Sequence, residues 1–283
     1  MEKIAIITDS DSNISLEEAK KLGVIVLSKP LSCGDEVIMD GVTLTYDEFV
    51  KELKDGKVYK SAQIAPQIVT DLFEETLKTH DYIIYIPISS KMSKTYETSL
   101  LIEREFNGRV KTIDARSVAE FQGYEVRLAK RLVDEGKSFK EICDILEGRG
   151  GSAIAYVVPE TLTYLKRGGR ITPAAAMLGN LIGLKPILIL KDGMIDKFDA
   201  VRTVKKALLV VINELANSDI SPETHDLFVL HTNELDRANE LVEMIKANEK
   251  LAGFNVNLAL IPGVVLCHTG PGALAVGYAI KHK

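Results

Sequence analysis

The sequence predicts an α/β protein with two domains, an N-terminal α/β domain on a parallel sheet and a C-terminal α/β domain on a mixed sheet. Short apolar runs alternate with amphipathic helical patterns along nearly the whole chain, which is typical of strands connected by helices. At 283 residues, the chain exceeds the usual size of a single hydrophobic core. The dipeptide Asp192-Gly193 separates two strand-like runs and predicts a hairpin, so we expect antiparallel pairing in the second half.

Eight strands are expected, each an apolar run of strand length bounded by polar or turn residues. They are residues 3–8, 24–28, 81–88, 109–114, 152–158, 185–190, 226–231 and 256–266. Three helices are expected to begin at capping boxes headed by Ser15, Thr45 and Ser138, where a hydroxyl and a glutamate bond the free amides of a first turn. The glycine-rich residues 148–151 end a helical pattern before a new strand, so we expect domains at 1–150 and 151–283.

Composition and motifs argue against several classes of function. The net charge of −5 gives no basic surface for nucleic acid. The three cysteines are widely spaced without a CxxC pair, so neither a disulfide framework nor a zinc site is expected. No signal peptide is recognisable, and the apolar residues 173–184 are too few to span a bilayer, which favours a cytoplasmic protein with a buried helix there. Neither GxGxxG nor GxxxxGK[ST] occurs, so no nucleotide site is expected.

Polar residues gather where two expected strands end, which is where open α/β sheets bind ligands. The stretch TDSDSN at 8–13 follows the first strand, and it is interpreted equally well as a turn with capping residues. Ser89, Ser90 and Ser93 follow the strand at 81–88 and precede a helix. Free amides and the dipole at a helix N-terminus favour an anion. Because capping needs only one serine, we interpret Ser90 or Ser93 as a ligand contact.

His268 follows the expected strand 256–266 and precedes Thr269-Gly270-Pro271-Gly272, which we expect to open a small-residue helix. A histidine there could be a general base, a metal ligand or a hydrogen-bond donor to an oxyanion. No HxH or HxxxH pattern supplies partners for a metal, so no metal site is expected. A structural histidine is an equally good interpretation.

Two basic segments offer charge for an anionic ligand or partner. Residues 166–172 form a basic, glycine-containing loop before the apolar segment, and Arg202, Lys205 and Lys206 stand at the start of another helix. Cations at a helix N-terminus oppose the helix dipole, which hints at a phosphate or an acidic partner. Solvated surface is the alternative for both segments.

Seven stretches together resemble the DegV family. They are TDS at 8–10, SAQIAP at 61–66, ISSKMSKTY at 88–96, TLTYLKRGGRI at 161–171, KPIL and DG within 185–193, VRTVKKA at 201–207 and HTGPGALAVG at 268–277. Their order and spacing match over essentially the full length. The resemblance implies two α/β domains with a fatty acid bound between them. It also implies the carrier (FakB-like) subunit of a fatty acid kinase, which presents the carboxylate to a separate ATP-binding subunit for acyl phosphate formation.

Carried over by position, the resemblance assigns roles to individual residues and implies no catalytic residue, cofactor or metal. The carboxylate contacts fall on Ser61, Ser93 and His268, with Ser90 nearby. Arg202 and Arg170 are implied in kinase docking or phosphate contact. We expect the wall of an acyl-chain tunnel along the helix that begins near Pro173, formed by Ala175, Leu178, Gly179 and Ile182. A transient contact with a membrane surface is compatible with this function.

The chain departs from the family pattern at Ser61 and Ala62, where threonine and then serine are usual, and at Lys91 and Lys94, where glycines are usual. Ser61 keeps a hydroxyl, whereas Ala62 loses one. These changes bear on chain preference and kinase recognition. An alternative function is a serine hydrolase acting on acyl esters, with Ser93 as nucleophile, His268 as base and Asp9 or Asp114 as the orienting acid. No GxSxG elbow occurs, so the carrier is the favoured interpretation, and a domain without any ligand is a third.

Overall fold

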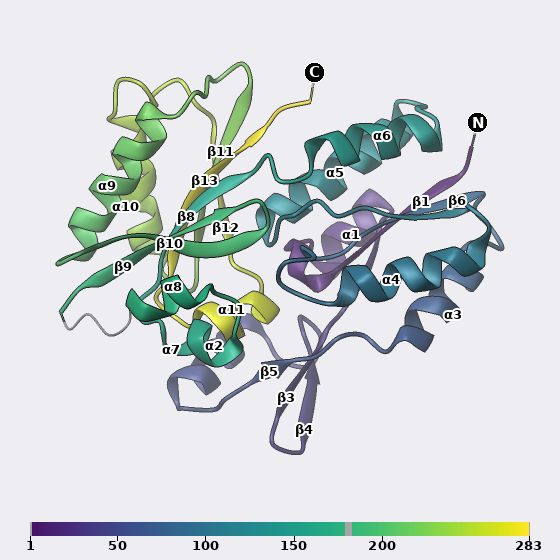
Figure 1. Ribbon diagram of the computed structural model, residues 1–283, viewed down its shortest axis with the longest axis horizontal. Coiled ribbons are helices and arrows are strands. Elements are labelled where there is room, and N and C mark those ends of the chain that lie inside the picture. Colours follow the sequence, from purple (N-terminus) through teal and green to yellow (C-terminus); the bar gives the residue numbers. More distant parts are fainter. Residues whose placement is uncertain (1, 179–182, 283) are drawn as a thin grey trace. The chain divides into compact units, whose positions relative to one another are not determined.

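The computed structural model describes residues 2–178 and 183–282 and divides the chain into two compact units (Figure 1). The first unit consists of Met1–Phe49, Val58–Gly151 and Pro262–Val264. The second consists of Val50–Lys57, Ser152–Ile261 and Val265–Lys283. Each unit is described by itself.

The first unit is built on a parallel sheet with strand order β2-β1-β6-β7. The strands are β1 (Ile4–Asp9), β2 (Ile25–Leu27), β6 (Tyr82–Ile86) and β7 (Val110–Thr112). In the register, Ile6 pairs with Ile84. All six residues of β1 are buried, because a parallel sheet is covered on both faces.

Alternate residues of β1 enter two different cores, since successive side chains point to opposite faces of a sheet. Ile4 and Ile6 pack in one core with helices α1, α5 and α6, whereas Ala5 and Ile7 pack in the other with α3 and α4. These helices are α1 (Leu16–Leu22), α3 (Pro66–Thr76), α4 (Thr95–Glu103), α5 (Glu120–Asp134) and α6 (Phe139–Arg149). The start of α6 confirms the capping box expected at Ser138. At the start of α1, Ser15 accepts from the backbone N of Glu18, but the Glu18 carboxylate pairs with Arg127, so only half of the expected capping box forms.

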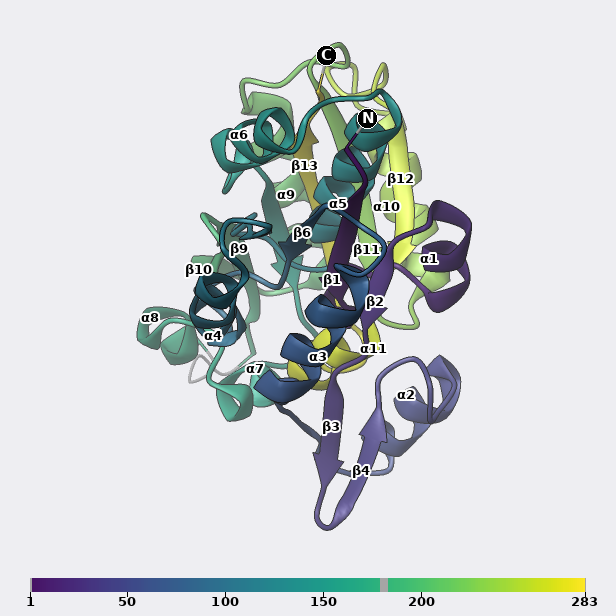
Figure 2. The ribbon, with the colours of Figure 1, turned by 90° about the vertical axis from the view of Figure 1, so that its right-hand side faces the viewer.

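A small antiparallel sheet of order β4-β3-β5 was not expected from the sequence (Figure 2). Its strands are β3 (Pro30–Cys33), β4 (Glu36–Met39) and β5 (Lys60–Ser61). They are two to four residues long and mostly not buried, so they lack the apolar runs by which the other strands were found. Helix α2 (Tyr46–Lys54) follows β4 and begins at the capping box expected at Thr45.

The second unit is built on a mixed sheet with strand order β10-β9-β8-β13-β11-β12. The strands are β8 (Ile154–Val158), β9 (Lys185–Lys191), β10 (Met194–Val201), β11 (His225–His231), β12 (Val256–Leu260) and β13 (Leu274–Ile280). All neighbours are antiparallel except β11 and β12. Asp192 and Gly193 join β9 to β10 with φ of 49° and 76°, which confirms the predicted hairpin.

Two helices, α9 (Val204–Asn217) and α10 (Leu235–Lys246), share one core with this sheet (Figure 1). Shorter helices are α7 (Thr163–Gly168), α8 (Pro173–Met177) and α11 (Gly263–Thr269), and single 3-10 turns are η1 (Ser10–Ser12) and η2 (Arg104–Phe106). A parallel sheet in the first unit and a mixed sheet in the second agree with the predicted fold class.

The prediction for residues 261–280 was wrong in two respects. The expected strand 256–266 ends at Leu260, and α11 begins at Gly263, because Pro262 lacks the N–H that a strand interior needs and suits the approach to a helix. The expected small-residue helix is instead the strand β13, which lies between β8 and β11. A glycine is required at 277, since a Cβ there would lie 2.2 Å from the carbonyl oxygen of Ile154.

Candidate functional site

The turn after β6 carries two of the predicted carboxylate contacts. Ser89 is fully buried, and its carbonyl oxygen accepts hydrogen bonds from the backbone N of Met92 (3.0 Å) and of Ser93 (3.2 Å). The backbone N of Ser90 donates to Asp114 Oδ1 (3.2 Å), which ties the turn to the segment after β7. The structure therefore brings Ser90 and Ser93 together in one short turn in front of α4.

Ser93 lies just before Lys94, the N-cap residue of α4. Its Oγ accepts a hydrogen bond from the backbone N of Thr95 (3.2 Å) and lies 2.8 Å from Thr95 Oγ1. The side chain is half-buried. A hydroxyl has one donor and two acceptor positions, so these two contacts with Thr95 leave capacity for a ligand. The ligand role of Ser93 stays a prediction.

Ser61 lies at the end of β5, where it pairs with Leu31 of β3. It is half-buried, and the next residue, Ala62, is exposed, with its backbone N donating to the carbonyl oxygen of Pro30 (3.0 Å). The hydroxyl of Ser61 is thus carried by a strand end in the same unit as Ser93.

His268 belongs to the second unit and lies in the last turn of α11. The helix ends at Thr269, and the next residue, Gly270, has a φ of 76° and a backbone N that donates to the carbonyl oxygen of Leu266 (2.8 Å). The imidazole is half-buried and packs against Gly168 of α7. The histidine is therefore held by a helix terminus and not by a strand end.

The basic loop joins α7 to α8 in the second unit. Arg170 Nη1 donates a hydrogen bond to the carbonyl oxygen of Gly168. Thr172 Oγ1 accepts from the backbone N of Ala175 (3.1 Å) and so caps α8. Of the predicted tunnel wall, Ala175 is fully buried and Leu178 is half-buried, and Gly179 and Ile182 lie outside the described residues.

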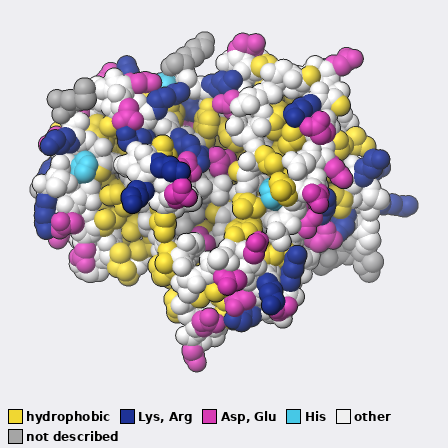
Figure 3. Space-filling model, turned by 180° about the vertical axis from the view of Figure 1, so that it is seen from behind, with side chains coloured by type: hydrophobic (Ala, Val, Ile, Leu, Met, Phe, Trp, Pro, Cys, Tyr) yellow, Lys and Arg dark blue, Asp and Glu magenta, His cyan; other side chains and the backbone are white. Residues whose placement is uncertain are grey.

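The second basic cluster is on the surface. Arg202 is exposed after β10, and Lys205 and Lys206 are exposed in the first turn of α9. Thr203 Oγ1 caps that helix by accepting from the backbone N of Lys206 (3.1 Å). Over the face shown in Figure 3, basic and acidic side chains are interspersed.

The polar residues after β1 form a buried ionic cluster with a lysine that the sequence analysis did not single out. Lys29 Nζ lies 3.3 Å from Asp9 Oδ2 and also pairs with Asp11 Oδ2, and all three residues are buried. Burial raises the pKa of Asp11 to about 7, although Lys29 opposes the shift. Burial lowers the pKa of Lys29, but the two aspartates outweigh burial and raise it.

The candidate orienting acids of the hydrolase alternative have other partners in the first unit. Besides its ion pair, Asp9 accepts hydrogen bonds from Gln122 Nε2 (2.9 Å) and from the backbone N of Ile88 (3.1 Å). Asp114 Oδ1 accepts from the backbone N of Ser90 (3.2 Å) and of Arg116 (3.0 Å). Both carboxylates therefore organise the backbone near the strand ends.

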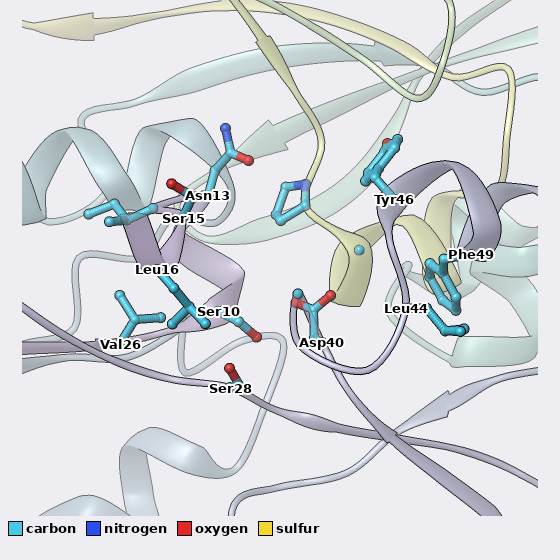
Figure 4. A pocket seen from close by; sticks show the side chains of 14 residues that line it. Ser10, Asn13, Ser15, Leu16, Val26, Ser28, Asp40, Leu44, Tyr46 and Phe49 are labelled. Carbon is cyan, nitrogen blue, oxygen red and sulfur yellow. The ribbon is translucent and has the colours of Figure 1, made fainter. Parts of the chain in front are cut away.

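A pocket of about 210 Å³ in the first unit contains a buried carboxylate that sequence reasoning missed. Asp40 lies between Ser10 and Tyr46 in Figure 4, and it is 8% exposed. Burial raises the pKa of Asp40 to about 6, against hydrogen bonds from Ser10 and from the backbone N of Val264. A Cβ on Gly263 would lie 2.3 Å from Asp40 Oδ1, so the carboxylate packs directly on the first turn of α11.

No three His, Cys, Asp or Glu side chains are placed to hold a metal ion within residues 2–178 and 183–282. In the same part of the chain, no helix is long and apolar enough to cross a membrane.

Comparison with known proteins identifies the family. A model of the DegV family matches residues 3–281. The chain belongs to the DegV family. A DegV domain-containing protein of Caldanaerobacter subterraneus subsp. tengcongensis is 32% identical in an alignment of 283 positions that covers 99% of this chain and 100% of that protein. The predicted family is therefore confirmed.

Solved DegV structures share the fold along the full chain. A DegV family protein of Thermus thermophilus, described by its fatty acid binding, is 27% identical with a TM-score of 0.89 over 99% of this chain and 100% of that one. DegV of Bacillus subtilis, described as a fatty acid binding protein, is 25% identical with a TM-score of 0.85 over the same shares. The predicted fold class is confirmed by this agreement.

Proposed function

We propose that this DegV protein binds a long-chain fatty acid, buries the acyl chain and holds the carboxylate through Ser61, Ser93 and His268. The observation that carries the proposal is the full-length likeness to the fatty-acid-binding DegV protein of Thermus thermophilus. Ser61 and Ser93 belong to the first unit and His268 to the second.

The chemistry of the turn before α4 supports an anionic head group. Backbone N–H groups at a helix N-terminus carry partial positive charge, and the α4 helix has nine residues. Hydroxyl and imidazole groups add neutral donors, which bind a carboxylate through charge-assisted hydrogen bonds without a buried countercharge. The same donors suit an acyl phosphate.

The acyl chain supplies most of the binding free energy in this proposal. About fifteen buried methylenes at about 0.8 kcal/mol each give about 12 kcal/mol, before the cost of ordering the ligand. The buried Ala175 and the half-buried Leu178 are proposed to line the tunnel. The tail then sets affinity, and the head-group residues set orientation.

We further propose that the bound carboxylate is presented to a separate, ATP-dependent kinase subunit in the cytoplasm. The exposed Arg202 is proposed to dock that subunit, and Arg170 to contact the phosphate. Lys91 and Lys94 are exposed beside the serine turn, and Lys94 Nζ pairs with Glu97 Oε1 at 3.0 Å. These two lysines add positive charge to the surface that a kinase would approach.

The test is mass spectrometry of the purified protein, as the intact native complex and as its organic extract. One fatty acid per chain, retained or taken up from a mixture of fatty acids, is the expected result. No fatty acid in either case would contradict the proposal. Steady release of p-nitrophenol from p-nitrophenyl butyrate, lost in Ser93→Ala, would instead favour the hydrolase. Kinase presentation is tested separately, by acyl phosphate formation with a fatty acid kinase subunit and ATP.

A further inference from the structure

One face of α7 packs against the end of α11 in the second unit. Tyr164 and Gly168 are four residues apart, so they lie on the same side of α7. A Cβ on Gly270 would lie 2.3 Å from Tyr164 Cδ2, and a Cβ on Gly168 would lie 2.3 Å from His268 Nδ1. The backbone of α11 at Gly270 thus packs against the ring of Tyr164, and the backbone of α7 at Gly168 packs against the ring of His268. No room for a larger side chain remains at either glycine.

The contact explains why residue 168 is a glycine. Its φ is not positive, and it lies in a helix, where glycine is less favourable than alanine by about 1 kcal/mol. Gly169 differs, because it has a φ of 66° at the helix end and open space around it. Backbone conformation therefore requires a glycine at 169, whereas the imidazole of His268 requires one at 168.

The geometry also distinguishes the two ring nitrogens. The atoms of His268 nearest to the Cβ position on Gly168 are Nδ1 at 2.3 Å, Cε1 at 3.2 Å and Cγ at 3.4 Å. The edge that carries Nδ1 therefore packs on Gly168, and Nε2 lies farther from it. Arg170 Nη1 also donates a hydrogen bond to the carbonyl oxygen of Gly168, so Gly168 contacts the side chains of both His268 and Arg170.

We propose that Gly168 is a positioning residue for His268: its bare Cα holds the Nδ1 edge of the imidazole, so that Nε2 is the nitrogen presented to the fatty acid carboxylate. The second half of this statement rests on the proposed function. An added methyl group at residue 168 displaces the ring, whereas the tail-binding residues keep their places.

The test compares Gly168→Ala with Gly148→Ala, a control at a helical glycine that has open space and no positive φ. Octanoate is the probe, because a short tail makes affinity sensitive to the head group. We expect Gly168→Ala to weaken octanoate binding by about tenfold, the scale of one hydrogen bond to a charged group. The control should stay within twofold of the wild type. Equal affinity of Gly168→Ala and the wild type would overturn the proposal.

A second background separates positioning from a general structural effect. In His268→Ala the ring is gone, so adding Gly168→Ala should change octanoate affinity and melting temperature little. Equal losses in both backgrounds would overturn the proposal. If Gly168→Ala alone fails to fold but the double variant folds, the clash with the imidazole is supported.

The imidazole ¹⁵N resonances of His268 in the ligand-free protein provide a measurement that does not depend on lipid. They should shift in Gly168→Ala and stay in place in Gly148→Ala, and unchanged resonances in both would overturn the positioning role. If the wild type binds no fatty acid but these shifts occur, the proposed function fails and the positioning of His268 stands.

Discussion

Replacing Asp40 by asparagine should stabilise the protein at neutral pH, although it removes a charge that accepts hydrogen bonds. The carboxylate is 8% exposed, and burial raises its pKa from 3.8 to about 6. The folded protein therefore binds a proton at Asp40 more tightly than the unfolded chain does. The free energy of unfolding consequently falls as the pH rises through this window and is lowest, with respect to this group, above pH 6.

The magnitude follows from the size of the shift. A difference of about two pH units corresponds to about 3 kcal/mol, since each unit is about 1.4 kcal/mol. Of this, about 2 kcal/mol lies between pH 4.5 and 7.5. Asparagine keeps the shape and one carbonyl acceptor but does not titrate. The free energy of unfolding of Asp40→Asn should thus exceed that of the wild type by up to about 3 kcal/mol at pH 7.5, and the difference should shrink toward pH 4.5.

Urea unfolding of both proteins at a series of pH values between 4.5 and 7.5 measures this difference. The buried Asp11 also titrates in this range, but its contribution is present in both proteins and largely cancels. Asp35→Asn is the matched control, because it removes an exposed carboxylate in the turn between β3 and β4. A difference between Asp40→Asn and the wild type that is constant with pH, or that grows toward acid, would refute the reasoning.

Three further predictions concern the head group and the tail. Ser93→Ala should lower the free energy of unfolding by about 1 kcal/mol, because Thr95 N loses a hydrogen-bond acceptor, and should weaken octanoate binding; an unchanged melting temperature and affinity would contradict both roles. His268→Ala should shift the ¹³C resonance of the bound carboxylate while the amount of co-purified lipid changes little. Complete loss of lipid from a folded variant would contradict the proposal that the acyl chain sets affinity and the head-group residues set orientation. Ala175→Phe should shift the extracted acyl chains toward shorter lengths in mass spectrometry, whereas an unchanged profile would show that α8 does not line the tunnel.

The parts of the fold that could be predicted have strong local signals. The sequence of the buried strand β1 is an apolar run, which predicts a strand, and Asp192-Gly193 predicts the β9–β10 hairpin. The strand β13 was predicted as a helix because Ala275, Gly277 and Ala279 carry no strand preference, and the close approach of β8 explains the glycine. The short strands β3, β4 and β5 lack buried runs altogether.

The candidate site divides in the same way. Ser93 could be found because polar residues between a strand and a helix are visible in the sequence. The buried roles of Lys29 and Asp40 could not, because each depends on a partner distant in sequence: Lys29 on the aspartates after β1, and Asp40 on Val264 near the other end of the chain. No local pattern distinguishes these two residues from exposed charges.

The division of the chain into units constrains how the protein can be dissected. The second unit contains Val50–Lys57 from the early part of the sequence, and the first contains Pro262–Val264 from the late part. A fragment ending at Gly151 would therefore contain Asp40 but lack the backbone N of Val264 that donates a hydrogen bond to it. It would also contain Val50–Lys57, which belongs to the second unit. No single cut yields two complete folding units, so fragment complementation and limited proteolysis should report the two halves as interdependent.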